Sequence, residues 1–120
     1  MGPRERAMTS HKKSILSHVG EIPEKGLKAT LFRSERVMVG VNALNPGGVQ
    51  ASHRHAGQDK FYLVQEGRGR FEVGEESFEG GPGDVVWAPA DVPHGVVNIG
   101  ATRLVLLIGI APEPPEKPHR

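Results

Sequence analysis

Residues 47–67, GGVQASHRHAGQDKFYLVQEG, contain two histidines, His53 and His55, that are separated by one residue. In an extended strand, residues two apart point to the same face, and their Cα atoms lie about 6–7 Å apart. Two imidazoles placed in this way can converge on one metal ion, because metal–nitrogen bonds are about 2.0–2.1 Å long. The spacing therefore predicts part of a metal site on a β-strand, with two surface histidines on an edge strand as the alternative.

A second stretch, residues 83–98, GDVVWAPADVPHGVVN, supplies a third histidine. Pro89 and Pro93 bracket a turn, and His94 follows it at the start of a β-branched run. The prolines restrict the backbone of this turn, so His94 is placed by a rigid segment. Three histidines carried on strands predict a site for one divalent transition metal ion, for which Fe, Mn, Co, Ni, Cu and Zn are all compatible.

The two stretches together resemble the two motifs of the cupin family. The first motif reads Gly, five residues, His-x-His, three or four residues, Glu, six residues, Gly. The second reads Gly, five residues, Pro-x-Gly, two residues, His, three residues, Asn. Eight landmarks of this chain keep these spacings: Gly47, His53, His55, Gly67, Gly83, Pro89, His94 and Asn98. Two positions depart from the family pattern, because its glutamate falls on Lys60 and the glycine after its proline is Asp91.

The resemblance implies an all-β fold, the cupin-type double-stranded β-helix or jelly-roll barrel of two antiparallel sheets, and a homodimer as the usual assembly. Composition favours the same fold class. The chain has 16 glycines and 10 prolines among its 120 residues, and its apolar runs are short and separated by turn signals. Many short elements joined by tight turns are typical of a β-sandwich or barrel.

Replacement of the family glutamate leaves two models of the ligand set. In the first, Asp59 adds an optional carboxylate to His53, His55 and His94, since it shares the odd-numbered parity of the first two histidines, provided that the connection over residues 56–58 does not change the register. In the second, which we favour, the three histidines bind the metal alone. Lys60 and Tyr62 then face the cavity beside it as candidate catalytic residues. The alternative for Lys60 is an outward-pointing wall residue.

The function implied by the resemblance is that of a small metal-dependent enzyme of the dioxygenase, isomerase or lyase type. Its expected substrate is a small molecule, either anionic or of the dicarbonyl type, held beside the metal ion. The competing hypothesis is a non-catalytic cupin that binds a small ligand or acts as a sensor, because fold does not determine function.

Length and composition narrow the remaining possibilities. A chain of 120 residues forms one domain. We expect a disordered leader over 1–13, one barrel over 14–110 and a flexible proline-rich tail over 111–120. The chain has no cysteine, so no disulfide framework is expected. It has no apolar run of membrane-spanning length and no signal-peptide pattern, so a cytoplasmic protein that does not bind membranes is expected.

Charge is spread unevenly along the chain. Residues 1–36 carry eight Lys or Arg against four Glu, a balance of +4, and residues 37–120 carry seven against ten, a balance of −3. The basic residues are scattered and lack aromatic neighbours, so a nucleic-acid partner is not expected.

Several segments read as strands. The segment Ile15 to Ile22 is expected as a short strand, and Leu27 to Phe32 as another. Residues 37–44 and 102–110 carry apolar side chains on both faces. Strands of this kind are expected where a barrel wall also packs against a second chain or another layer, and they support the homodimer.

Overall fold

The computed structural model describes residues 10–113. In this part of the chain there are nine strands and one short 3₁₀-helix. The elements in chain order are η1 (Leu16–His18), β1 (Leu27–Arg33), β2 (Met38–Leu44), β3 (Val49–His53), β4 (Asp59–Glu66), β5 (Gly69–Val73), β6 (Glu76–Gly80), β7 (Val85–Ala88), β8 (His94–Asn98) and β9 (Leu104–Ala111). The first nine residues of the expected leader and residues 114–120 of the expected tail lie outside the described residues.

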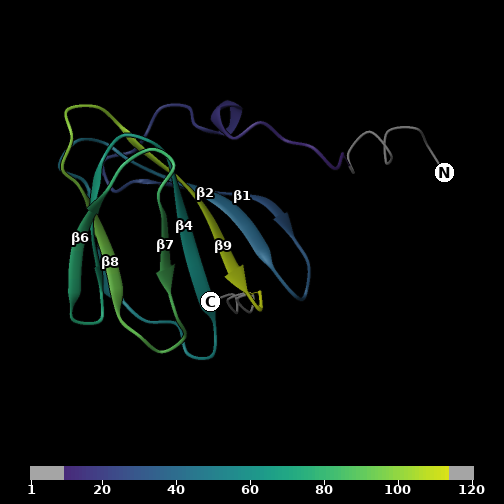
Figure 1. Cartoon of the computed structure of the whole chain (residues 1–120). Coiled ribbons are helices and arrows are strands. Elements are labelled where there is room, and N and C mark those ends of the chain that lie inside the picture. The colour runs from purple at the N-terminus through teal and green to yellow at the C-terminus, as the bar shows by residue number, and fades with distance from the viewer. Residues whose placement is uncertain (1–9, 114–120) are drawn as a thin grey trace, which may run out of the picture.

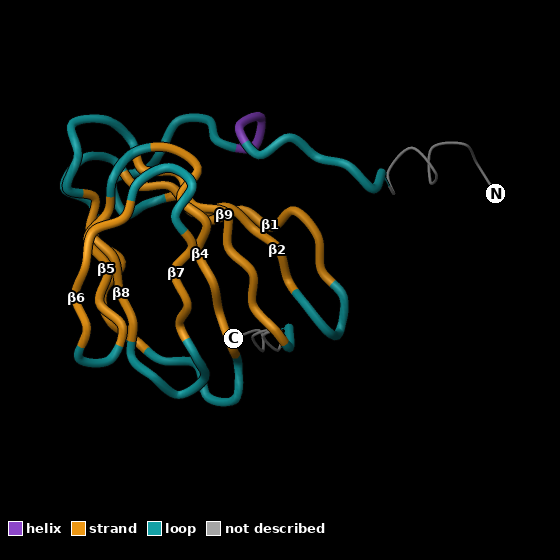
Figure 2. Tube along the Cα trace, viewed as in Figure 1, coloured by secondary structure: helices purple, strands orange, loops and turns teal. Residues whose placement is uncertain are grey.

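The strands form two antiparallel sheets. A five-stranded sheet has the order β1-β2-β9-β4-β7, and a four-stranded sheet has the order β3-β8-β5-β6. Figure 1 shows the strands of the larger sheet following one another from β7 to β1, with β8 and β6 beside them. Figure 2 shows that strands and the loops between them make up nearly all of the described chain. The expectation of an all-β barrel of two antiparallel sheets is confirmed.

The core lies between the two sheets. Side chains alternate across each strand with a period of two, so every second residue faces inward. Tyr62 and Val64 of β4 pack there with Leu104 and Leu106 of β9, and Phe71 of β5 meets them from the smaller sheet. Because both faces of β9 are apolar, only the pairing of the sheets shows that Leu104 and Leu106 face inward.

The outer face of the larger sheet is also apolar, and part of it is covered by the same chain. The segment Ile15 to Ile22, expected as a strand, instead forms an arm that contains η1. Its apolar residues Ile15, Val19 and Ile22 are four and three positions apart, a helical rather than a strand spacing. They pack in one cluster with Val41 of β2 and Val105 of β9. This face of β2 and β9 therefore needs no second chain to bury it.

Contacts at both ends attach the described chain to the barrel. Lys13 Nζ donates a hydrogen bond to the carbonyl oxygen of Leu31 at 2.8 Å. At the other end, Gln58 Nε2 donates to the carbonyl oxygen of Pro112 at 3.2 Å, and Arg33 forms an ion pair with Glu113. The arm and the start of the C-terminal segment thus both lie against the sheet.

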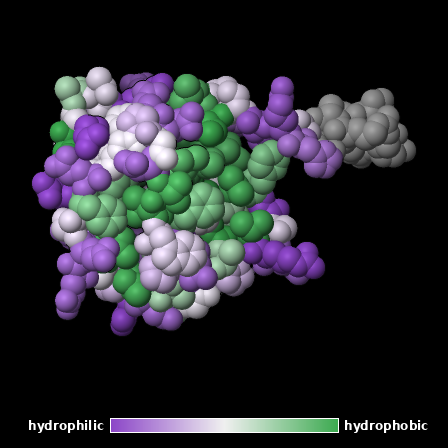
Figure 3. Space-filling view, viewed as in Figure 1, coloured by the Kyte–Doolittle hydropathy of each residue, from purple (hydrophilic) through white to green (hydrophobic). Residues whose placement is uncertain are grey.

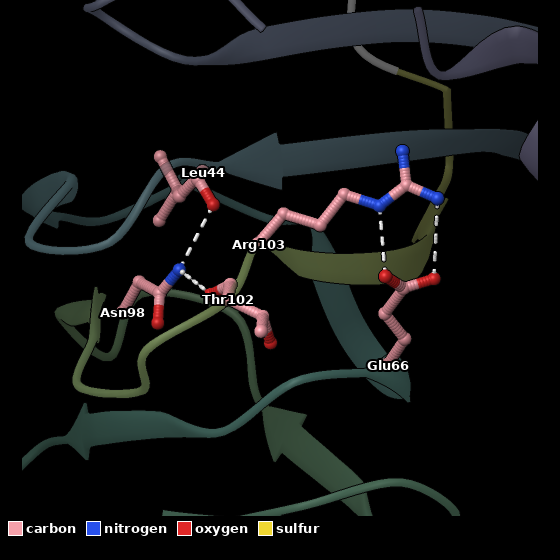
Figure 4. A network of polar contacts seen from close by, with 5 residues as sticks. All are labelled: Leu44, Glu66, Asn98, Thr102 and Arg103. Carbon is pink, nitrogen blue, oxygen red and sulfur yellow. Dashed lines mark hydrogen bonds and ion pairs between the residues drawn. The ribbon is translucent and has the colours of Figure 1, made fainter.

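Two of the motif landmarks hold the barrel together away from the histidines. The side-chain amide of Asn98 donates hydrogen bonds to the carbonyl oxygens of Leu44 and Thr102, both at 2.9 Å (Figure 4). Gly67 has a φ of +90°, and a Cβ at this position would lie 2.4 Å from the carbonyl oxygen of Arg103. Figure 4 also shows that the guanidinium of Arg103 pairs with the carboxylate of Glu66, the residue before Gly67. Asn98 and Gly67 therefore have structural roles.

A two-residue turn joins β5 and β6. β5 and β6 pair through the two residues Gly74 and Glu75, and Gly74 has a φ of +60°.

In the space-filling view of Figure 3, apolar residues are gathered across the middle of the visible face, with hydrophilic residues around them. Between residues 10 and 113, no helix is both long and apolar enough to cross a membrane.

Candidate metal centre

The pairing of β3 with β8 brings the three motif histidines together. His53 is the last residue of β3, and it lies directly opposite His94, the first residue of β8. His55 follows two residues after His53, beyond the strand end. In the described part of the chain, these three residues are the one group of histidine, aspartate and glutamate side chains whose donor atoms all lie within 4.8 Å of one another.

The distances within this histidine cluster fit a shared ion. His53 Nε2 and His55 Nε2 are 3.1 Å apart. Two nitrogens that each lie about 2.0–2.1 Å from one ion are separated by about 3 Å. The ring centroids of His53 and His94 are 4.7 Å apart, and those of His55 and His94 are 5.3 Å apart. The three rings are thus close enough for one ion to contact them all.

Backbone hydrogen bonds fix the tautomers of two of the histidines. His53 Nδ1 donates to the carbonyl oxygen of Ala51 at 2.9 Å, and His94 Nδ1 donates to that of Val92 at 3.1 Å. With the proton on Nδ1, Nε2 keeps a free lone pair, and this tautomer of the ring can bind a metal ion through Nε2. His94 Nε2 is buried and has no hydrogen-bond partner among the described residues. A bound cation would satisfy this otherwise unpaired atom, so the residues fit a metal ion.

The site also favours neutral imidazoles. Burial lowers the pKa of His55 from 6.5 to about 4, and the neighbouring His53 and Lys60 contribute to the same shift. Burial likewise lowers the pKa of His94, although its bond to Val92 opposes the shift. Because a metal ion binds only the unprotonated ring, these histidines are ready to ligate at neutral pH.

Asp59 is not brought to the histidine cluster. Its carboxylate oxygen Oδ1 accepts a hydrogen bond from the backbone N–H of Ala90 at 2.9 Å, and the side chain is exposed. The parity argument for Asp59 assumed an unbroken strand from His53. A turn through Gly57, whose φ is +69°, interrupts that strand and reverses the parity. The geometry therefore matches the model with three histidine ligands.

Lys60 and Tyr62 both face inward from β4. Lys60 is only 5% exposed and lines the cavity next to the histidines. Its Nζ lies 4.7 Å from the centre of the Tyr62 ring. The Tyr62 ring is 6.2 Å from that of His94, and its hydroxyl is buried without a hydrogen-bond partner among the described residues. Burial raises the pKa of Tyr62 above its ordinary value, so the hydroxyl keeps its proton.

A cavity of about 180 Å³ opens beside the histidine cluster. His53, His55 and Lys60 line one part of it, and Lys28 and Asn42 line another. No aspartate or glutamate among the described residues lines this cavity. Burial, followed by the charge of Lys28, lowers the pKa of Lys60 from 10.5 to about 8. The cavity is therefore electropositive.

Lys28 is the site residue that the motifs could not indicate, because β1 precedes both of them. A signal was nevertheless present in the alternation of β1, where Lys28 and Thr30 interrupt Leu27, Ala29 and Leu31. The apolar set of such a strand faces one side and the polar set the other. Here the polar set lines the cavity, and Leu31 packs under the N-terminal arm.

The other departure from the motifs, Asp91, has a local explanation. Its φ is +68°, the left-handed region in which glycine is unstrained and which aspartate tolerates better than most residues. The backbone N–H of Asp91 donates to the carbonyl oxygen of His55 at 3.0 Å. The turn before His94 is therefore tied directly to the loop that carries His55.

Fold and site together define a class: a double-stranded β-helix barrel with three converging histidines that could hold a metal ion. A family model described as the cupin domain matches residues 40–109. The chain therefore belongs to the cupin family, as the spacing of its two motifs predicted.

Solved structures share the fold. The protein TT1209 from Thermus thermophilus is 40% identical to this chain, with a TM-score of 0.83 over 88% of this chain and 100% of that one. An uncharacterized protein with a double-stranded β-helix domain from Klebsiella pneumoniae is 22% identical, with a TM-score of 0.80 over 86% of this chain and 90% of that one. A predicted oxalate decarboxylase from Thermotoga maritima is 26% identical, with a TM-score of 0.61 over 63% of this chain and 66% of that one.

Proposed function

We propose that this cupin is a metal-dependent enzyme that binds one divalent transition metal ion at His53, His55 and His94. The observation that carries the proposal is the unpaired, buried Nε2 of His94, which lies beside the two other imidazoles and next to a cavity. Imidazole ligands suit Fe, Mn, Ni, Co, Cu and Zn, so the ion is one of this series.

The substrate is a small molecule, anionic or of the dicarbonyl type, that enters the cavity beside the ion. When bound, the ion supplies Lewis acidity to a substrate oxygen or a place for dioxygen, which covers dioxygenase, isomerase and lyase chemistry. Lys60 and Tyr62 are the proposed catalytic residues. Lys60 offers an ammonium to substrate oxygens, and Tyr62 offers a hydroxyl that stays protonated and can donate a hydrogen bond. The Thermotoga maritima neighbour, a predicted oxalate decarboxylase, supports a small acid as the substrate.

A specific observation also favours a second candidate, a non-catalytic ligand-binding or sensor cupin. Asp59 faces away from the histidine cluster, and no other carboxylate among the described residues lines the cavity. Proton abstraction would therefore depend on Lys60, because the histidines that line the cavity are the proposed metal ligands. A binder needs no such base.

Metal analysis combined with a turnover screen tests this proposal. We expect one equivalent of a transition metal in the purified full chain after loading and dialysis. The loaded protein is then assayed for oxygen consumption and for product formation with small carboxylates and diketones. Turnover of any of them supports the enzyme, and tight binding without turnover supports the sensor. A chain that retains no transition metal after loading would overturn the metal-dependent function.

We further propose that the partner of this chain is a second copy of itself, bound through the uncovered half of the outer face. Phe61 and Leu63 of β4 are half-buried there, while Val85 and Trp87 of β7 are 66% and 56% exposed. Because β7 ends the larger sheet, this apolar surface runs to the sheet edge. Exposed apolar patches of this kind are typical of interfaces between subunits.

Light scattering of the full chain at micromolar concentration tests this assembly. We expect a dimer mass for the parent and a monomer mass for Trp87→Lys, because the two-fold contact would bring the new charges together in an apolar interface. Ile99→Lys is the matched control, since Ile99 is also exposed but lies elsewhere on the barrel. A monomer mass for the parent would contradict the proposal.

A further inference from the structure

Lys60 is a charged residue in a buried position without a counter-ion. It is 5% exposed, and it forms no ion pair with any described residue. The Tyr62 ring, whose face attracts a cation, lies close to it, with 4.7 Å between Lys60 Nζ and the ring centre. The attraction of a cation to an aromatic ring is weaker than the cost of burying an unpaired ammonium. The tyrosine alone therefore does not compensate for the burial.

Lys28 adds a second ammonium to the same cavity. It lies on β1, whereas Lys60 lies on β4, and strands β2 and β9 separate them in the sheet. Both lysines line the cavity, and the charge of Lys28 acts on Lys60. His53 and His55 line the same cavity, so the positive charges of the lysines lie beside the histidine cluster. With no acidic residue in the described lining, this positive charge has no protein partner there.

We propose that Lys28 and Lys60 form an anion subsite, which holds a carboxylate or phosphate group of a small ligand. Another oxygen atom of the same ligand faces the histidine cluster. The inference rests on the proposed function for the role of the histidines, but the anion subsite itself is built from the two lysines. It narrows the substrate from anionic or dicarbonyl to a molecule with an oxyanion group. The anion supplies the counter-charge that Lys60 lacks.

The cavity volume suits a small ligand. Its volume of about 180 Å³ corresponds to about six water molecules at about 30 Å³ each. Small acids and short phosphate esters fit inside such a space. Asn42 of β2 adds an amide to the lining and Ile108 and Ile110 of β9 add apolar side chains, so the lining offers both polar and apolar contacts.

Calorimetry on the metal-loaded full chain provides the test. The probes are malonate, inorganic phosphate and neutral acetylacetone, and the variants are Lys60→Met and Lys28→Met. Lys12→Met is the matched control, because Lys12 is exposed and does not line the cavity. Hydrogen bonds to charged groups contribute about 1.5–3 kcal/mol, or about ten- to a hundredfold in affinity.

We expect Lys60→Met to weaken malonate binding by about tenfold or more and Lys28→Met by a few-fold, because Lys28 is exposed. Acetylacetone affinity and metal content should not fall in either variant, and Lys12→Met should match the parent. Tighter binding of malonate than of phosphate by the parent would identify a carboxylate ligand, and the reverse would identify a phosphate ligand. An unchanged affinity of Lys60→Met for both anions would overturn the anion subsite.

The same probes separate failure of the subsite from failure of the proposed function. If the chain retains no metal, malonate is titrated into the metal-free protein after any chelator has been removed by dialysis. Binding that Lys60→Met abolishes would then support the lysine pair while the metal function fails. Absence of anion binding in both the loaded and the metal-free protein would overturn the inference.

Discussion

The two strands that carry the histidine cluster are held in the barrel very differently. Among the described strands, β3 lies at a sheet edge and pairs with β8 alone, and four of its five residues, including His53, are exposed. β8 lies between β3 and β5, and four of its five residues, including His94, are buried. One ligand of the candidate metal centre is thus part of the core, and the others stand at its rim. The difference predicts that His94 supports both fold and metal, whereas His53 supports metal alone.

The largest expected effect separates these two histidines. Both His53→Ala and His94→Ala should lose the metal, and with it about 3 kcal/mol of stabilisation at a metal concentration a hundredfold above the dissociation constant. In the metal-free protein, His94→Ala should cost a further 2–4 kcal/mol or so because it leaves a cavity in the core. His53→Ala should then stay within about 0.5 kcal/mol of the parent, as exposed substitutions do.

Urea unfolding with and without a chelator measures both quantities, and metal content is determined separately. Equal losses for the two variants in the metal-free protein would break the comparison between the strands. Full metal content in His94→Ala would show that His94 has a structural role only.

Lys60 sharpens the comparison, because it belongs to the first motif but lies on a buried strand. Burial lowers its pKa from 10.5 to about 8, so its penalty on folding is present in full below pH 8. As the pH rises from 8 to 10.5, the folded chain loses this proton before the unfolded chain does, and the free energy of unfolding increases. The expected relief is about 3 kcal/mol, at about 1.36 kcal/mol per pH unit.

The measurement compares Lys60→Met with the parent in the metal-free protein. The methionine side chain carries no charge, so the variant should be more stable at pH 7, and its advantage should shrink by about 3 kcal/mol by about pH 10.5. Groups that titrate in both proteins cancel in the difference. An advantage that does not change with pH would mean that Lys60 is solvated, and Lys12→Met should show none at any pH.

Much of the site followed from spacing and from the resemblance to the cupin motifs. The interval between His53 and His55 and the position of His94 after Pro93 predicted the residues that the pairing of β3 and β8 brings together. The count of six residues back from Gly67 assigned Lys60 to the glutamate position, and the structure places it in the cavity wall. These predictions succeeded because strand periodicity and turn lengths are local properties that a sequence encodes directly.

The parts that failed depended on geometry between distant segments. The side chain of Asp59 was expected on the same face as His53, but the turn at Gly57 puts it on the opposite face. The residue types in that turn do not reveal whether it shifts the strand register. Lys28 joins the cavity only because β1 ends the larger sheet beside β2. The spacing of Ile15, Val19 and Ile22 was helical, but the surface that they cover becomes known only once β2 and β9 are paired.

The smallest expected effect concerns the turn that leads into β8. Asp91 has a φ of +68° and an exposed side chain for which no hydrogen bond is present in the described part of the chain. Glycine removes the left-handed strain, which is about 1–2 kcal/mol for an ordinary residue and smaller for aspartate, but it adds entropy to the unfolded chain. We expect Asp91→Gly to stabilise the protein by about 0.5 kcal/mol, or about 2–4 °C in Tm.

Asp91→Ala keeps a Cβ without aspartate's tolerance of this region, so it should destabilise by about 1 kcal/mol. Thermal unfolding should therefore give the highest Tm for Asp91→Gly, an intermediate Tm for the parent and the lowest Tm for Asp91→Ala. If glycine ranks below aspartate, the Asp91 carboxylate makes a stabilising contact, and the buried strand that carries His94 depends on the side chain of its turn as well as on the backbone.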